Sequence, residues 1–311
     1  MLNNFMTVAG QVITLFILMG VGFALRKLKR LPDEVLKTLS FLVLNIVAPC
    51  IIVNSMQIER TAERLGEMGV TALVSLVYFA MAFVITIPMF RKYPHNTRIV
   101  MRFGTLHSNL GFMGFPLIAA ALGQDALRHA AIVLVVFSII LWTSGITIMG
   151  SDGGGDSKKT FSWKLALVNP GTVGFAIGIV LFGLNIKLPW PIGNAVAHVA
   201  DVNTPLAMIV IGAQMADAEI FSLFRDKSLY TVSLMRLIVL PALLALVLLP
   251  FNLPPLIFAT CVILFGTPVA GITSMMSQRF NRDTPTAARL VTMTTLLSVI
   301  TLPVLATLVK L

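Results

Sequence analysis

The stretch "NLGFMGFPLIAAALG", from Asn109 to Gly123, decides how the rest of the chain is interpreted. It holds three glycines and a proline, yet it is too apolar to be an ordinary loop. In lipid every backbone N–H and C=O must be paired, so an interrupted helix persists only where protein or a cavity hosts the interruption. We therefore expect a membrane helix whose break has a purpose.

The composition is that of a membrane protein. Of 311 residues, 57% are hydrophobic and 12% charged, and the mean hydropathy is +0.92. A soluble domain carries about 25% charged residues. Apolar runs long enough to cross a bilayer recur along the whole chain. We predict an all-α polytopic membrane protein in contact with the lipid bilayer. The formal charge of +10 then reflects basic loops, and no nucleic-acid partner is expected.

Ten membrane spans are predicted. Their ranges are 4–25, 34–56, 67–90, 98–121, 126–149, 162–183, 192–216, 228–250, 254–278 and 285–309. Of the 23 Lys and Arg residues, 17 lie in the loops after the odd-numbered spans, 5 lie on the opposite side, and Arg236 lies within span 8. Because basic residues concentrate on the cytoplasmic side, both termini should face outside a cell (inner or plasma) membrane.

The hydrophilic stretch Gly150 to Trp163 divides the chain into two halves. We expect a first five-helix unit over 1–149, a cytoplasmic linker over 150–161 and a second unit over 162–311, which together make one transport unit. Because each half has an odd number of spans, any structural repeat must be inverted across the membrane.

The two halves share a faint pattern of helix-disturbing residues. Asn45 and Pro49 in span 2 resemble Asn203 and Pro205 in span 7. Pro116 in span 4 similarly matches Pro268 in span 9. Matched interruptions in two halves indicate the binding site of a transporter. The alternative is that proline and glycine are common in membrane helices and produce harmless kinks.

Prolines in spans 4 and 9 predict broken helices. Proline lacks an N–H and frees the carbonyl four residues earlier, which here belongs to Phe112 and Leu264. New half-helices would begin near Pro116 and Pro268, each with a partially positive N-terminus. Since the two spans run in opposite directions, these ends could meet near the bilayer centre and attract an anion.

The residues beside these breaks are the candidate substrate site. Four glycines, Gly111, Gly114, Gly266 and Gly271, would allow close backbone approach. Three neutral polar side chains, those of Ser108, Asn109 and Thr267, could hydrogen-bond a carboxylate. No His-Glu-x-x-His motif and no pair of aspartates at membrane depth occurs, so we expect no metal, no cofactor, no catalytic residue and no enzyme.

Ionisable residues inside the spans are few. His107 in span 4 could carry a proton or pair with an anionic substrate, or it could be a hydrogen-bonded wall residue. Arg236 is expected to extend towards the cytoplasmic interface rather than to bind substrate. All thirteen acidic residues can be placed in loops or near span ends.

Three motifs make the chain resemble the auxin efflux carrier family, which includes bacterial organic-acid carriers. They are "SNLGFMGFPL" (Ser108 to Leu117), "LVLNIVAPC" (Leu42 to Cys50) and "TLLSVITLPV" (Thr295 to Val304). The resemblance implies an inverted five-plus-five repeat, crossed and broken spans 4 and 9, and one helix bundle that moves against another, often in a homodimer. It also implies substrate contacts at Asn45, Pro49, Asn109, Pro116 and Pro268.

The sequence therefore predicts a secondary transporter of small organic anions, such as malonate, malate or auxin-like acids, that works by alternating access. Its co-substrate could be a proton or Na⁺, or it could need none. One alternative is a Na⁺-coupled organic-anion symporter resembling the bile-acid carriers. Another is an anion channel.

Overall fold

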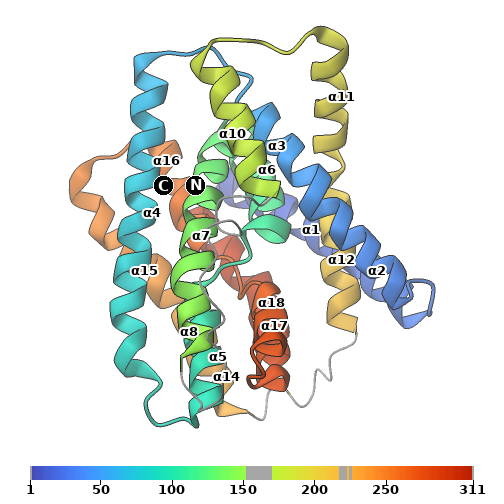
Figure 1. Ribbon diagram of the computed structural model, residues 1–311, viewed down its shortest axis with the longest axis vertical. Helices are drawn as coiled ribbons and strands as arrows, with labels where there is room; N and C mark the ends of the chain where they lie inside the picture. Colours follow the sequence, from blue (N-terminus) through green and yellow to red (C-terminus); the bar gives the residue numbers. More distant parts are fainter. Residues whose placement is uncertain (1, 152–169, 217–222, 224–225, 310–311) are drawn as a thin grey trace.

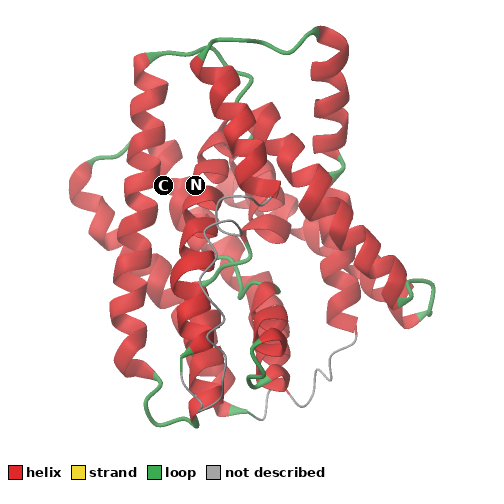
Figure 2. Cartoon of the chain, in the orientation of Figure 1, coloured by secondary structure: helices red, strands yellow, loops and turns green. Residues whose placement is uncertain are grey.

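The computed structural model describes residues 2–151, 170–216, 223 and 226–309. Over these residues the chain is helical with short connections and contains no β-strand (Figure 2). The helices of the first half are α1 (Leu2–Lys27), α2 (Asp33–Leu42), α3 (Ala48–Ser55), α4 (Ala62–Met89), α5 (His95–Leu106), α6 (Phe115–Leu122), α7 (Leu127–Ile140) and α8 (Ile146–Gly150). Those of the second half are α10 (Pro170–Gly183), α11 (Trp190–Asp201), α12 (Asn203–Ala216), α14 (Lys227–Leu234), α15 (Leu240–Leu248), α16 (Pro255–Phe265), α17 (Ile272–Arg279) and α18 (Thr284–Leu308).

Six described helical segments are long and apolar enough to cross a membrane. They are Asp33–Ser55, Ala62–Met89, Gln124–Gly150, Trp190–Ala216, Ser228–Phe251 and Thr284–Leu308. Three shorter apolar helices, Leu110–Leu122, Pro170–Gly183 and Pro255–Phe265, correspond to parts of the fourth, sixth and ninth predicted spans. The chain is thus a multi-pass membrane protein. The start of the sixth predicted span and most of the 150–161 linker lie outside the described residues.

The helices form two groups. In Figure 1, α1, α2, α3, α11 and α12 lie together on one side, and α10 packs against α3. We call these six helices the flanking group. The other helices surround the two interrupted segments, and we call them the crossover group. The groups touch where α1 meets α6 and α18, and where α7 meets α3 and α10.

Three π-helical turns each end two residues before a proline. They are Val43–Val47 before Pro49, Leu110–Gly114 before Pro116, and Met235–Val239 before Pro241. The proline ring would clash with the carbonyl four residues earlier, and a widened turn absorbs that clash without breaking the helix. The prediction of a half-helix that begins near Pro116 is therefore wrong, because the helix runs from Leu110 through this proline to Leu122.

The true interruptions lie elsewhere in the two segments. The first is residues 107–109, between the end of α5 at Leu106 and the π turn that begins at Leu110. The second is residues 266–271, between the end of α16 at Phe265 and the start of α17 at Ile272. Pro268 lies inside this second gap, so the following half-helix begins four residues later than predicted. The Leu264 carbonyl is not free either, because the Thr267 hydroxyl donates to it at 2.7 Å.

Polar contacts join the helix ends at one end of the crossover group. The Thr97 hydroxyl of α5 donates to Asp283 at 2.7 Å, and Asp283 caps α18 through the Thr286 N–H. Arg282 donates to the Met149 carbonyl and to Asn96. Burial opposes ionisation of Asp283, but the hydrogen bonds from Thr97 and Thr286 and the charge of Arg289 outweigh it and lower its pKa. This carboxylate therefore stabilises the fold at neutral pH, and its contribution is lost as the pH falls through its folded-state pKa.

Among the described glycines, Gly22 and Gly212 mark the closest backbone approach, which is between α1 and α12. A Cβ on Gly22 would lie 2.0 Å from the Ile209 carbonyl oxygen, and a Cβ on Gly212 would lie 1.8 Å from that of Met19. Small residues let membrane helices approach this closely and gain dispersion contacts. Since the obstructing atoms belong to the backbone, no side-chain rotation can relieve a substitution.

We predict that Gly22→Ala destabilises the protein by about 1–3 kcal/mol, the usual cost of overpacking. The control is Gly20→Ala on the same helix, where an added Cβ has no neighbour within 4 Å. Thermal unfolding of the purified proteins should show a lower midpoint for the first variant alone. Equal midpoints would contradict the close packing of α1 on α12.

Candidate functional site

The two interruptions pair with each other through their backbones. Ser108 and Val269 form an isolated antiparallel bridge. The Asn109 N–H donates to the Pro268 carbonyl at 2.8 Å, and the Ala270 N–H donates to the His107 carbonyl at 2.9 Å. We call residues 107–109 and 266–271 the crossover. It brings together groups that are about 160 residues apart in the sequence.

Arg236 connects both sides of the crossover. Its Nε–H donates to the Thr267 carbonyl at 3.0 Å, and one Nη1–H donates to the Thr105 carbonyl at 3.2 Å. Nη1 also donates to the Tyr78 hydroxyl. The guanidinium carbon lies 5.8 Å from the centre of the Tyr78 ring, which stacks on Phe265. One side chain thus ties α4, the end of α5 and the end of α16 together.

The position of Arg236 suits its charge. Helices α5 and α16 end beside it, and the C-terminal end of a helix carries a partial negative charge that a cation stabilises. Among the described residues, no carboxylate forms an ion pair with Arg236, and its side chain has no exposed surface. The prediction that Arg236 extends to the membrane interface is therefore wrong, because the carbonyls of Thr105 and Thr267 accept its hydrogen bonds and hold it inside the protein.

Helix α18 supports the second interruption. The Val269 N–H donates to the Thr294 hydroxyl at 3.0 Å, and that hydroxyl donates in turn to the Leu290 carbonyl at 2.8 Å. An unpaired buried amide costs about 1–3 kcal/mol. The Thr294 side chain therefore lets the chain remain non-helical at this depth.

Several polar side-chain groups at the crossover have no partner among the described residues. Asn109 precedes the π turn at Leu110, but its side chain makes no capping hydrogen bond. The Ser108 hydroxyl, His107 Nε2 and Arg236 Nη2 are buried without hydrogen-bond partners. A hydroxyl, an amide and a guanidinium can each donate to a carboxylate. Donors without partners thus collect where two helices also begin.

His107 is held in one orientation. Its Nδ1 lies 2.8 Å from the Phe103 carbonyl, which can only accept, so Nδ1 carries the proton. In the neutral ring Nε2 is then an acceptor and cannot donate to a carboxylate. The ring stacks on Phe103 and meets Phe137 edge-on. This environment fits the interpretation of His107 as a hydrogen-bonded wall residue.

The remaining predicted residues of spans 4 and 9 have varied positions. The Thr267 hydroxyl is bound to Leu264, so its carbonyl, not its side chain, takes part in the crossover. A Cβ on Gly114 would lie 2.8 Å from the Leu264 side chain. A Cβ on Gly266 would lie 2.2 Å from the Leu305 side chain. Both glycines therefore permit close packing. Gly271 has open space beside it and precedes α17.

The residues predicted from spans 2 and 7 lie in neighbouring elements. The Asn45 amide donates to the Phe41 carbonyl of its own helix, at 2.9 Å. Pro49 packs against Gly174 of α10. Asn203 is buried, and its side-chain oxygen has no hydrogen-bond partner within the described ranges. The link to the crossover is indirect, because Leu44 of this segment lies 3.6 Å from where a Cβ on Gly111 would be.

Of the residues that hold the crossover together, sequence reasoning missed Tyr78 and Thr294 and misplaced Arg236. Tyr78 and Thr294 carry no recognisable signal, because single hydroxyls are common in apolar helices. Arg236 carried one, since an arginine within an apolar span is costly and is usually functional.

We predict that Tyr78→Phe lowers the free energy of unfolding by about 1–3 kcal/mol, because it removes a hydrogen bond to a buried charged group. The matched control is Tyr93→Phe, whose hydroxyl makes no hydrogen bond among the described residues. Thermal or denaturant unfolding should separate the two variants. Indistinguishable stabilities would show that the Arg236 clamp does not depend on Tyr78.

Known proteins match this chain over nearly its full length. Over 310 residues the chain is 22% identical to a protein of Rhizobium meliloti named "Putative malonate transporter", covering 97% of this chain and 96% of the relative. It is also 22% identical over 303 residues to an "Uncharacterized transporter" of Methanothermobacter thermautotrophicus, covering 96% and 97%. A family model described as "Membrane transport protein" matches residues 7–306. The chain belongs to this family of membrane transport proteins and is a transporter, not an enzyme.

Proposed function

We propose that the protein is a secondary carrier of small carboxylates and that the crossover holds the substrate. The observation that carries this proposal is that the two interruptions pair through their backbones beside Asn109, whose side chain makes no capping hydrogen bond. Two helix N-termini, at Leu110 and Ile272, begin within a few residues of that pairing. Such ends attract anions.

The charge at the crossover favours an anionic substrate. Arg236 contributes a full positive charge, and no described carboxylate is paired with it. The relative named for malonate transport suggests a short dicarboxylate as the first acid to test. Asn109 and Ser108 would orient one carboxylate by hydrogen bonding, while Arg236 would set the electrostatic potential around it.

Burial favours a carrier over an open channel. His107, Ser108, Thr267 and Arg236 have no exposed surface, and Asn109 is 7% exposed. A substrate can therefore reach these groups only after helices separate, as alternating access requires. Movement of the crossover group against the flanking group would provide the opening, in line with the motion that the family resemblance implies.

We also propose the finer membrane arrangement of ten spans in an inverted repeat, with both termini outside. Its support is the distribution of Lys and Arg, of which 17 of 23 fall on the side expected to be cytoplasmic. For a negative-inside cell, a dianion that crosses alone gains about 4.6 kcal/mol per 100 mV on leaving, so uncoupled transport would be export.

The direct test is to reconstitute the purified protein and record currents on a solid-supported membrane. Malonate, malate, lactate and an aromatic acid are applied in turn, with and without Na⁺ and a pH gradient. A saturable current from one of these acids is expected. A strict Na⁺ requirement would instead favour a symporter like the bile-acid carriers, and a current that does not saturate would favour a channel.

We predict that Asn109→Ala weakens carboxylate binding by roughly ten- to a hundredfold, the equivalent of one hydrogen bond to a charged group. Folding should be unaffected, because this side chain makes no capping bond. Substrate titration of the reconstituted protein measures the change. Asn54→Ala, near the end of α3, serves as the control. Wild-type affinity in Asn109→Ala would remove the crossover as the substrate site.

A further inference from the structure

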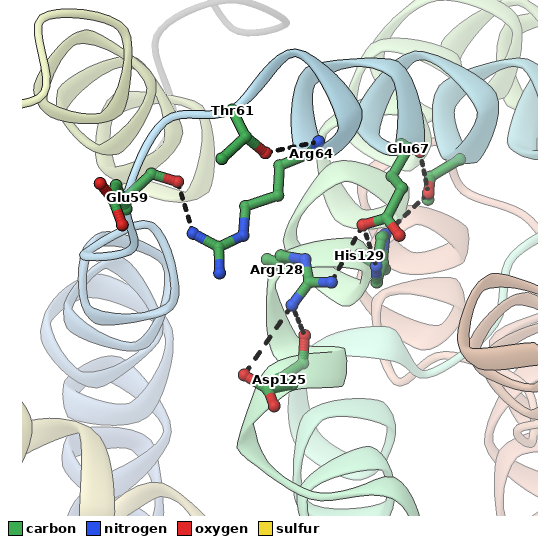
Figure 3. Close-up of polar contacts among 8 residues, drawn as sticks. Glu59, Thr61, Arg64, Glu67, Asp125, Arg128 and His129 are labelled. Carbon is green, nitrogen blue, oxygen red and sulfur yellow. Dashed lines mark hydrogen bonds and ion pairs between the residues drawn. The ribbon is translucent and has the colours of Figure 1, made fainter. Parts of the chain in front are cut away.

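A second polar cluster lies near the N-terminal end of α4. Arg91 and Lys92 follow the other end of this helix. Figure 3 shows Glu67 of α4 facing Arg128 and His129 at the start of α7. Arg128 Nη2 lies 3.0 Å from Glu67 Oε2, and His129 Nε2 lies 3.8 Å from the same oxygen. His129 is fully buried, and its Nε2 has no hydrogen-bond partner in the described part of the chain.

Hydrogen-bond directions determine the state of the His129 ring. The Thr71 hydroxyl donates its single proton to the Glu67 carbonyl at 2.8 Å. Towards His129 Nδ1, at 2.9 Å, that oxygen can then only accept. Nδ1 therefore carries a hydrogen, and in the neutral ring Nε2 presents a lone pair to the Glu67 carboxylate. Two acceptors face each other, and a proton on either one converts the repulsion into a hydrogen bond.

The ion pairs around Glu67 leave one carboxylate charge uncompensated. Arg128 lies 3.8 Å from Asp125 as well as against Glu67, so two carboxylates share one guanidinium. Arg64, on the neighbouring turn of α4, donates instead to the Glu59 carbonyl (Figure 3). Helices α3, α6, α10 and α16, which also pack against α7, contain no Asp, Glu, Lys, Arg or His; their titratable groups are the Cys50 and Cys261 thiols.

Both helices of this cluster lead to the crossover. Tyr78, the partner of Arg236, follows Glu67 by eleven residues, or about three helical turns, and thus lies on the same side of α4. Phe137 follows His129 by eight residues, and its ring lies 5.6 Å from that of His107. A change in how α4 packs on α7 at Glu67 would therefore reach two residues of the crossover region.

We propose that Glu67 and His129 together bind one proton, and that this proton is the coupling ion of the carrier. Proton uptake draws the imidazole and the carboxylate together and tightens α4 against α7. The coupling role rests on the proposed carboxylate transport, whereas the proton site itself does not. His107, whose Nε2 faces no carboxylate among the described residues, is not the coupling site.

The site is tested without any substrate. Protein labelled with ¹⁵N in its histidine rings is titrated from pH 8 to pH 3 by NMR, and the His129 signals are assigned with His129→Gln. In the wild type, Nε2 should gain a proton in this range. In Glu67→Gln the transition should move to lower pH by about one unit or more, because a neighbouring opposite charge is removed.

The matched control is Glu63→Gln, which removes the same charge one helical turn earlier at an exposed position. It should leave the His129 transition at its wild-type pH. Circular dichroism and thermal unfolding establish that each variant is folded. An unchanged His129 transition in folded Glu67→Gln would overturn the proton site.

Coupling is tested by uptake of the transported acid into liposomes with and without a pH gradient. Stimulation by the gradient should be lost in Glu67→Gln and kept in Glu63→Gln. A folded Glu67→Gln variant that still responds to the gradient would overturn the coupling role. The NMR titration needs no substrate. If the protein transported no carboxylate, the proposed function would fail, and the proton site would still be tested by NMR.

Discussion

Two helix interruptions inside an apolar protein leave main-chain carbonyl and amide groups without helical partners, and in lipid each unpaired group costs several kcal/mol. The structure of the crossover group depends on how these groups are satisfied. The interruptions pair with each other, Arg236 donates to the carbonyls of Thr105 and Thr267, and Thr294 accepts from Val269. Removing any one of these partners would leave a buried backbone group unpaired, at a cost of several kcal/mol.

This solution has an electrical consequence. A buried arginine normally requires a carboxylate, but here two helix ends and a phenol replace it. Among the described residues the crossover therefore carries a net positive charge, and this charge is shielded from solvent, where electrostatic interactions are strong. A protein built in this way can bind an anion without a basic residue dedicated to it. The arrangement explains how one residue contributes both to the fold and to the proposed recognition of carboxylates.

The proposed proton site is physically separate from the crossover but is mechanically joined to it. Helices α4 and α7 pack along one another, and each also contacts the crossover region, α4 through Tyr78 and α7 through Phe137. Tyr78 stacks on Phe265, and Phe79 contacts both Phe137 and Phe265. Aromatic rings thus connect α4 with α7 and α16. Closely packed interiors transmit small displacements, so a change in one contact can alter another.

The sequence was enough to predict the membrane class, the helical fold and the position of the unusual segments, because bilayer solvation acts on composition and run length directly. It also indicated Asn109 as an unusual polar residue beside a break. The location of the breaks was decided by tertiary structure. Pro116 looked like a helix breaker, but a π turn absorbs it, and the gap falls at residues 107–109 instead. Whether a helix bends or breaks depends on which neighbours can receive the freed backbone groups. Arg236, Tyr78, Thr294 and the Glu67–His129 pair come from distant parts of the chain, so only the packed structure brings such partners together.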